Sequence, residues 1–547
     1  MCLFRDRGGL GGEHDVRTQQ IGRWESGALA HAVTDPFGQG PLPWLRGSEH
    51  YFENGRVVPW YVDLASGCEG HTGAAAGPDG GPGGTAARTG RPGTAPVPGT
   101  GTGTDFTRVI PTPRGTGSGP RTADDVHCQI KGFASGDGGV LPGASIDFRV
   151  TVNPPQPFSV DVYRIGHYGG EGATKITTSP RLSGIVQPEP LAAERTVSCH
   201  HWWLSWRLQI PDYWSTGAHV AVLTTADGHR SHVPFTVRDR DPADLLLLMP
   251  DITWQAYNLF PEDGRTGASL YHAWDSEGRL LGEEDAAVTV SFDRPFAGAG
   301  LPLHVGHAYD FIRWAERYGY DLAYADTRDL HAGRVDPTRY RGLVFPGHDE
   351  YWSGPMRRAA EKARDSGTAL VFLSANSMYW QVELDPLANG APDRLLSCRK
   401  RRGGGRSALW REQGEPEQQL LGIQYAGQVP EPRPLVVRNA DHWLWDATGA
   451  AEGDELPGLV AGEADRYFPR TQLPAHTHRI LLAHSPYRTH AGARRHQETS
   501  LYRAASGALV FASGTFAWSP ALDRPGHTDA RVQRATANLL DRICKRD

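Results

Sequence analysis

The C-terminal half of the chain has short, continuous apolar runs separated by segments of helical periodicity, and this alternation most constrains its fold. The runs are Leu245–Met249, Leu343–Phe345, Ala369–Leu373 and Ala508–Ala512. The helical sets of apolar residues are Ala308, Phe311, Ile312 and Ala315; Met356, Ala359, Ala360 and Ala363; and Val532, Ala535, Leu539 and Ile543. Strands without alternation, divided by amphipathic helices, predict a parallel sheet covered on both faces. Because crossovers are right-handed, we expect a doubly wound α/β domain.

The preceding segment, from Ile130 to Arg238, has a different pattern. Apolar and polar residues alternate there, as in Ile146, Phe148 and Val150, and turn residues recur at intervals of about ten positions. Short alternating strands between turns are typical of an all-β fold. This segment therefore predicts a β-sandwich.

A composition break divides the front of the chain from the sandwich. The segment from Gly70 to about Ala123 is rich in Gly and Pro and almost lacks aliphatic residues, so we predict a disordered linker. The aromatic-rich piece before it, 21–64, is too short to fold alone and should dock on another part of the chain. The expected parts are an N-terminal segment (1–69), the linker (70–124), the β-sandwich (125–240) and the α/β domain (241–547).

One stretch of the α/β domain, from Arg399 to Tyr467, has no clear period. We expect an irregular insertion there. Its basic run, Arg399–Arg402, is expected to be a solvated loop, with anion binding as the alternative.

Charge and composition exclude several classes of protein. Lys and Arg number 56 and Asp and Glu number 62, a net charge of −6, without a long block of one sign. This argues against a nucleic-acid partner. No run approaches the about 18 apolar residues of a membrane span, and the start of the chain lacks the apolar core of a secretion signal. The six cysteines have no zinc, redox or disulfide spacing, so we expect unpaired thiols in a cytoplasmic protein.

Polar residues follow two of the predicted parallel strands, where open α/β sheets bind their ligands. His348, Asp349 and Glu350 follow the second apolar run, and Asn376 follows the third. In an extended chain His348 and Glu350 share one face, while Asp349 points away. A base, a carboxylate and an amide in one crevice are a suitable set for hydrolysis. The alternative is that Asp349 or Ser353 caps the next helix and the other residues are incidental.

The sequence contains no G-x-S-x-G, no H-E-x-x-H and no cysteine in an apparent catalytic context. A hydrolase built on this chain must therefore activate water through acid–base residues, a metal ion or both. A further candidate segment follows the first apolar run and contains Tyr257 and Tyr271. Tyrosines near strand ends usually serve packing or hydrogen bonding, so alone they indicate little.

Four motifs together resemble the large subunit of N,N-dimethylformamidase. They are W-x-A-Y-N followed by S-L-Y, G-H-D-E-Y-W-S, N-x-x-Y-W, and S-G-A-L-V-F-A-S-G-T-F-A-W. The resemblance runs from about Ile130 to the C-terminus, and the front piece around His31–Gly38 resembles the small subunit of the same enzyme. The linker would then join two fused subunits. The resemblance implies a glutaminase-like (flavodoxin-like) parallel sheet preceded by an Ig-like β-sandwich.

The resemblance also implies a mononuclear non-haem iron (Fe³⁺) held by two tyrosinates and one glutamate. On this sequence the ligands are Tyr257, Tyr271 and Glu350. Three anionic oxygen donors suit a hard trivalent ion. Such an ion can polarise an amide oxygen or lower the pKa of bound water.

The remaining matches are catalytic. His348 and Asn376 match the family's catalytic histidine and a nearby asparagine, and Glu498 matches a further catalytic carboxylate. In those roles His348 would take and return a proton, and Asn376 would orient the amide or the oxyanion. We expect a small amide substrate, no nucleic-acid or membrane partner, and a homo-oligomer.

Three departures from the family pattern touch the pocket rim. A longer loop, 259–266, separates the two tyrosines, Ala268 stands where Lys is common, and the segment after Trp518 differs.

We predict an iron-dependent hydrolase that cleaves the C–N bond of a small N-alkyl amide such as N,N-dimethylformamide by metal-activated water. The alternatives are an iron enzyme of another reaction type in a biosynthetic pathway and a non-catalytic ligand-binding protein.

Overall fold

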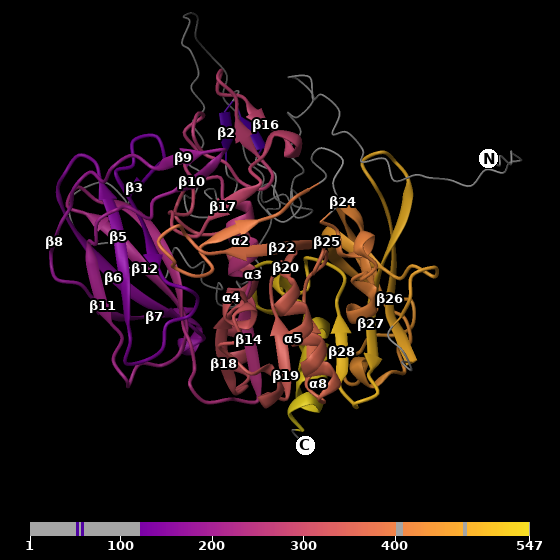
Figure 1. Ribbon diagram of the computed structural model, residues 1–547. Coiled ribbons are helices and arrows are strands. Elements are labelled where there is room, and N and C mark those ends of the chain that lie inside the picture. Colours follow the sequence, from indigo (N-terminus) through magenta and orange to yellow (C-terminus); the bar gives the residue numbers. More distant parts are fainter. Residues whose placement is uncertain (1–50, 54–55, 59–120, 401–407, 474–477, 546–547) are drawn as a thin grey trace, which may run out of the picture. The chain divides into compact units, whose positions relative to one another are not determined.

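The computed structural model describes residues 51–53, 56–58, 121–400, 408–473 and 478–545 (Figure 1). Of the predicted N-terminal segment, only a small antiparallel pair is described, β1 (Tyr51–Glu53) with β2 (Arg56–Val58). The rest of that segment and the predicted linker up to residue 120 lie outside the described residues. Part of the basic run, 401–402, also lies outside them.

The segment predicted as a sandwich contains two antiparallel sheets around one apolar core. One sheet has the order β11-β5-β4, and the other has the order β3-β13-β12-β6-β7, with β8 also paired to β6. Their bounds are β3 (Arg121–Thr122), β4 (Ile130–Ser135), β5 (Ser145–Val152), β6 (Pro157–Ile165), β7 (Ala173–Thr178), β8 (Leu182–Ser183), β11 (Trp206–Gln209), β12 (Gly217–Thr225) and β13 (His229–Val237). Phe148 and Val150 pack with Val160, Val162 and Leu223 of the other sheet. This is the all-β part that the alternation predicts.

A seven-stranded sheet forms the centre of the following α/β part, in the order β18-β14-β19-β21-β28-β27-β26. The bounds are β14 (Leu245–Met249), β18 (Leu322–Asp326), β19 (Gly342–Phe345), β21 (Ala369–Phe372), β26 (His478–Arg488), β27 (Arg494–Arg503) and β28 (Leu509–Ala512). The pairs from β18 to β28 are parallel, and β28-β27 and β27-β26 are antiparallel. The prediction of a wholly parallel sheet is therefore wrong at this edge. The short turn between β26 and β27 makes a hairpin, which only antiparallel strands can form.

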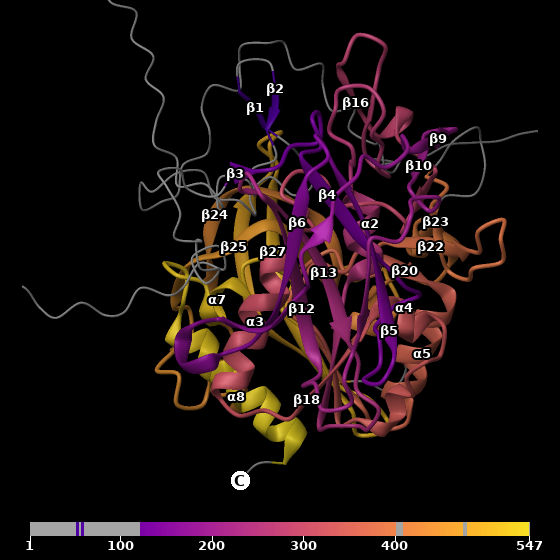
Figure 2. The same ribbon diagram turned by 90° about the vertical axis from the view of Figure 1, so that its left-hand side faces the viewer.

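Helices cover both faces of this sheet, as Figure 2 shows, with α3 and α8 on one side and α4 and α5 on the other. The three predicted helices are confirmed as α3 (Val305–Arg317), α5 (Gly354–Asp365) and α8 (Ala530–Cys544); α4 (Thr327–His331) and α7 (Pro520–Asp523) are shorter. Ser353 caps α5, because its Oγ accepts a hydrogen bond from the Met356 amide at 3.3 Å. Of the two residues proposed as the cap, Ser353 has this role and Asp349 does not.

Smaller elements complete the described chain. They are β9 (Leu191–Ala193), β10 (Thr196–Ser198), α2 (Asp251–Tyr257), β15 (Ala273–Trp274), β16 (Leu280–Leu281), β17 (Thr289–Ser291), β20 (Tyr351–Ser353), β22 (Trp380–Asp385) and β23 (Leu395–Ser397). No helix among the described residues is both long and apolar enough to cross a membrane. The four cysteines within the described ranges, Cys128, Cys199, Cys398 and Cys544, are free thiols, as their spacing predicts.

The expected irregular insertion contains regular structure, so that prediction is wrong. After α6 (Gln418–Leu421), two long strands pair antiparallel, β24 (Gln424–Val436) and β25 (Glu455–Arg466). The sequence hides β24 because it holds Pro430, Pro432 and Pro434, and proline is confined to strand edges and bulges. The pairing accommodates them through register shifts between Val429 and Leu435.

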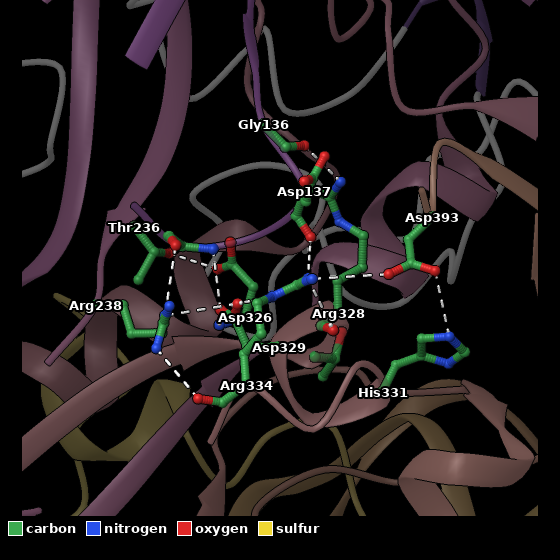
Figure 3. A network of polar contacts seen from close by, with 12 residues as sticks. Gly136, Asp137, Thr236, Arg238, Asp326, Arg328, Asp329, His331, Arg334 and Asp393 are labelled. Carbon is green, nitrogen blue, oxygen red and sulfur yellow. Dashed lines mark hydrogen bonds and ion pairs between the residues drawn. The ribbon is translucent and has the colours of Figure 1, made fainter. Parts of the chain in front are cut away.

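A buried polar network joins the sandwich to the α/β part at α4 (Figure 3). Arg328 donates from Nε to Asp251 Oδ2 at 2.5 Å and from Nη1 to the Gly136 carbonyl at 2.9 Å. The Asp329 carboxylate accepts from the Gly139 amide at 2.9 Å, and Thr236 donates to Asp326 at 2.5 Å. These contacts fix the sandwich against the amino end of α4.

Replacing Arg328 by methionine should lower the free energy of unfolding by about 3 kcal/mol or more, because it leaves the Asp251 carboxylate buried without its cation. Both side chains of this pair are only 11% exposed. Arg341→Met is the matched control, since the Arg341–Asp244 pair is 45% and 32% exposed and should be worth less than about 1 kcal/mol. Urea unfolding of the three proteins measures both effects. Equal losses of unfolding free energy in the two variants would contradict the prediction that the Arg328–Asp251 pair stabilises the protein more than an exposed ion pair does.

Candidate active site

Three neighbouring strands of the central sheet bring the predicted site residues together. Tyr257 ends α2, which follows β14, while His348 and Glu350 follow β19 and Asn376 follows β21. The strands pair in the order β14-β19-β21, so their carboxyl ends are adjacent. The expectation that these strand ends are neighbours is confirmed.

The oxygen atoms of two tyrosines and one glutamate converge at the centre of this site. Tyr271 Oη donates to Glu350 Oε1 at 2.7 Å, and Tyr257 Oη donates to Glu350 Oε2. The two phenol oxygens lie 3.2 Å apart, and their rings stack with centroids 4.7 Å apart. Glu350 is almost fully buried, and both tyrosines are half-buried.

His348 lies directly against this oxygen cluster. Its Nε2 is 3.0 Å from Tyr257 Oη and 3.2 Å from Glu350 Oε2. As predicted, His348 and Glu350 lie on one side of their short segment. The other side of the imidazole packs on Phe516, with ring centroids 4.5 Å apart, and edge-on to His304 at 5.9 Å. Phe516 comes from the C-terminal motif, which therefore contributes one wall of the site.

Asn376 completes the cluster in an unusual backbone conformation. Its φ of 55° lies in the left-handed region, and its amide N–H donates to Asp465 Oδ1 at 2.8 Å. Its side-chain Nδ2 lies 3.2 Å from Glu350 Oε1 and 3.3 Å from Glu463 Oε1. The Oδ1 atom has no hydrogen-bond partner among the described residues. A strained, buried amide with a free acceptor is a feature of functional sites.

Glu463 belongs to the site, and the sequence reasoning missed it. It lies on β25, with Oε2 3.9 Å from His348 Nε2. Burial, together with the charge of Glu350, raises its pKa well above the usual value. Burial also raises the pKa of its neighbour Asp465 to about 7. The signal available was the apolar run Leu459–Ala461, which marks a buried strand and is separated from Glu463 only by Gly462.

Glu498 has different surroundings from the other predicted catalytic residues. Its Oε2 accepts from the Tyr467 amide at 2.7 Å, and its Oε1 lies 3.0 Å from His484 Nδ1 and 3.7 Å from His496 Nε2. These partners are not members of the cluster around Glu350. The structure thus brings together five of the six predicted site residues, and Glu463 is a carboxylate of the same cluster that the sequence reasoning did not predict.

Arg294 holds the long loop between the two tyrosines. It is buried and donates from Nη1 to the Ala268 carbonyl and from Nη2 to the Asn258 carbonyl, both at 2.8 Å. The loop also closes at Gly267, where a Cβ atom would lie 2.0 Å from the Pro261 carbonyl oxygen, so no larger residue fits. Because the loop is fixed, Tyr271 stays stacked on Tyr257 although the connection between them is longer than in the family pattern.

The charges around the cluster set the protonation of its oxygens. Burial, and then the Glu350 charge, raise the pKa of both Tyr257 and Tyr271 well above the usual value. Burial would also raise the pKa of Glu350, but hydrogen bonding to His348 and the positive charge of Lys400 bring it below its usual value. Lys400 Nζ lies 3.5 Å from the centroid of the Tyr271 ring. Without a further cation, the two phenols therefore stay protonated beside an ionised glutamate.

The mixed sheet with helices on both faces makes this an α/β protein. The buried ionisable residues at the carboxyl ends of its strands form a candidate active site. The chain belongs to the family described as N,N-dimethylformamidase beta subunit-like, C-terminal, whose model matches residues 159–531.

Two curated relatives are beta subunits of N,N-dimethylformamidase. The protein from Paracoccus aminophilus is 27% identical over 281 residues, and the one from Alcaligenes sp is 25% identical over 281 residues. Each match covers 43% of this chain and 36% of the relative. The chain therefore matches only about a third of the length of these relatives.

Proposed function

We propose that this protein is an iron-dependent amidohydrolase that cleaves the C–N bond of a small N-alkyl amide, such as N,N-dimethylformamide. The observation that carries the proposal is the convergence of Tyr257, Tyr271 and Glu350, with oxygen atoms about 3 Å apart, beside His348 and Asn376. The names of the two relatives support the substrate class.

The donor set fits a ferric ion. Two phenol oxygens and both oxygens of Glu350 form one compact group. Bound Fe³⁺ would displace the two phenolic protons, which otherwise hydrogen-bond to the carboxylate. Two phenolates and a carboxylate then balance its three charges, and hard oxygen donors suit it. When bound, the ion would act as a Lewis acid toward the amide oxygen or toward water.

The protein's own residues would move the protons. His348 would accept a proton from the attacking water through the nitrogen that faces the cluster, and would return it to the departing nitrogen. One C–O bond forms and the C–N bond breaks, which yields a carboxylic acid and an amine. The wall formed by Phe516 and His304 holds the imidazole in this orientation.

Asn376 and Glu463 would act on the amide. The Asn376 Nδ2 group donates to both Glu350 and Glu463, and its N–H bonds would turn to the substrate carbonyl oxygen as that oxygen becomes an oxyanion. Glu463, with its raised pKa, is suited to hold a proton near His348. Glu498 takes no part in this proposed reaction, because its contacts lie outside this cluster.

Three finer assignments accompany this proposal. The strand order β18-β14-β19-β21-β28 supports a flavodoxin-like class for the parallel part of the sheet. The relatives are named beta subunits, which supports an assembly of several chains. We infer that segment 1–69 supplies the equivalent of a smaller subunit.

Metal analysis and an amide assay test the proposal. The purified protein should contain about one iron per chain and show a visible tyrosinate-to-iron absorption band, and it should release dimethylamine and formate from N,N-dimethylformamide. Iron with no hydrolysis across a panel of small N-alkyl amides would favour an iron enzyme of another reaction type. A colourless protein without iron would favour a binding protein.

A further inference from the structure

Two histidines and a glutamate form a second cluster on the β26–β27 hairpin, at the edge of the central sheet. His484 lies on β26 directly opposite Glu498 of β27, and His496 lies two residues before Glu498. Residues two apart on a strand point to the same face, so all three side chains share one face of the hairpin. Their potential ligand atoms all lie within 4.8 Å of one another.

The glutamate of this cluster is held in a fixed orientation. The Tyr467 amide donates to Glu498 Oε2 at 2.7 Å, which leaves Oε1 facing both imidazoles, 3.0 Å from His484 Nδ1 and 3.7 Å from His496 Nε2. A backbone hydrogen bond to the second carboxylate oxygen is typical support for a metal ligand. The imidazole rings of His484 and His496 stack with centroids 4.3 Å apart, so the two histidines lie side by side.

The exposure of the three side chains suits an accessible site. Glu498 is only 6% exposed, whereas His484 and His496 are 44% and 29% exposed. The buried ligand provides a fixed charge, and the partly exposed histidines leave a path to solvent.

We propose that His484, His496 and Glu498 bind a divalent transition-metal ion of the zinc type, with a fourth position open to water. Two imidazoles and one carboxylate are a known zinc ligand set. This donor set differs from the phenol and carboxylate oxygens around Glu350, so the two sites should prefer different metals. No residue belongs to both sites, and the inference does not depend on the proposed function.

Nearby positive charges disfavour the binding of a metal ion at this cluster. Arg466 and Arg479 both interact electrostatically with Glu498, and Arg466 and Arg495 disfavour a positive charge on His496. The alternative state of the cluster is therefore a hydrogen-bonded His–Glu group without a metal. The affinity for a metal ion decides between the two.

Zinc titration of the full-length protein as purified, followed by calorimetry and metal analysis, tests this inference. The wild type should bind one equivalent of Zn²⁺, whatever metal the Glu350 cluster holds. His484→Ala and His496→Ala should each weaken binding at least about tenfold, since removal of a mere supporting residue already costs about 10- to 100-fold. His490→Ala is the matched control, an exposed histidine in the turn of the same hairpin, and should bind zinc normally.

Two further measurements show whether zinc is bound at this cluster. Glu350→Gln should retain zinc binding, because that residue belongs to the other cluster. The zinc X-ray absorption spectrum should contain imidazole scattering that disappears in the doubly substituted His484→Ala/His496→Ala protein, whose circular dichroism should match that of the wild type. Absence of zinc uptake by the wild type, or unchanged uptake by the double variant, would overturn the inference.

Discussion

Replacing Glu350 by glutamine should remove most of the iron, the visible colour and the hydrolytic activity. The substitution keeps the size of the side chain but deletes the one carboxylate that both Tyr257 and Tyr271 contact. With that charge gone, two phenolates alone would have to balance a trivalent ion in a buried site. The loss of metal affinity should exceed the about 10- to 100-fold that loss of a supporting residue costs. Metal analysis and the visible spectrum of the purified variant measure it.

Glu383→Gln serves as the control for this experiment. Glu383 is an exposed residue of β22, and its replacement by glutamine removes the same charge away from the cluster. It should leave iron content and activity unchanged. A Glu350→Gln protein that kept its full iron content would contradict the ligand assignment, and equal losses in both variants would indicate a general effect of charge.

The strand ends of the site could be predicted because both signals are local. A buried parallel strand has a continuous apolar run, and the polar residues directly after it lie at the ligand-binding edge. His348, Glu350 and Asn376 satisfy both conditions, and the structure places His348 Nε2 and Asn376 Nδ2 each 3.2 Å from a carboxylate oxygen of Glu350. The pairing of Tyr257 with Tyr271 was less evident from pattern alone, because a long loop separates them and a distant residue, Arg294, holds that loop in place.

The missed features depend on contacts that are distant in sequence. Glu463 reaches the site on β25, whose partner strand is interrupted by prolines and register shifts and therefore lacks a regular period. Glu498 precedes a buried strand and matches a family pattern, but β27 runs antiparallel to β28. Its side chain consequently meets His484 across the hairpin instead of the Glu350 cluster. Spacing along the chain therefore could not show which of the two carboxylates, Glu463 or Glu498, reaches the Glu350 cluster.

Replacing His348 by alanine should leave the iron and its colour in place while turnover falls by roughly 10²- to 10⁴-fold, the usual contribution of a general acid or base. The metal should remain because Tyr257, Tyr271 and Glu350 contact one another without the imidazole. Turnover should fall because Nε2, 3.0 Å from Tyr257 Oη, is the basic nitrogen in contact with the proposed metal ligands. Single-turnover assays on iron-loaded protein measure the chemical step directly.

The separation of metal binding from turnover is what identifies the role of His348. His490→Ala, at an exposed turn, controls for the loss of a histidine and should change neither property. An iron-free His348→Ala protein would instead make the imidazole a metal ligand, because Nε2 already lies 3.2 Å from Glu350 Oε2. Near-normal turnover with iron retained would leave His348 a packing residue against Phe516, and the proton transfer would then fall to Glu463, whose Oε2 lies 3.9 Å from His348 Nε2. Glu463→Gln in the same assay distinguishes that case, since it removes a proton site while preserving the hydrogen-bond capacity toward Asn376.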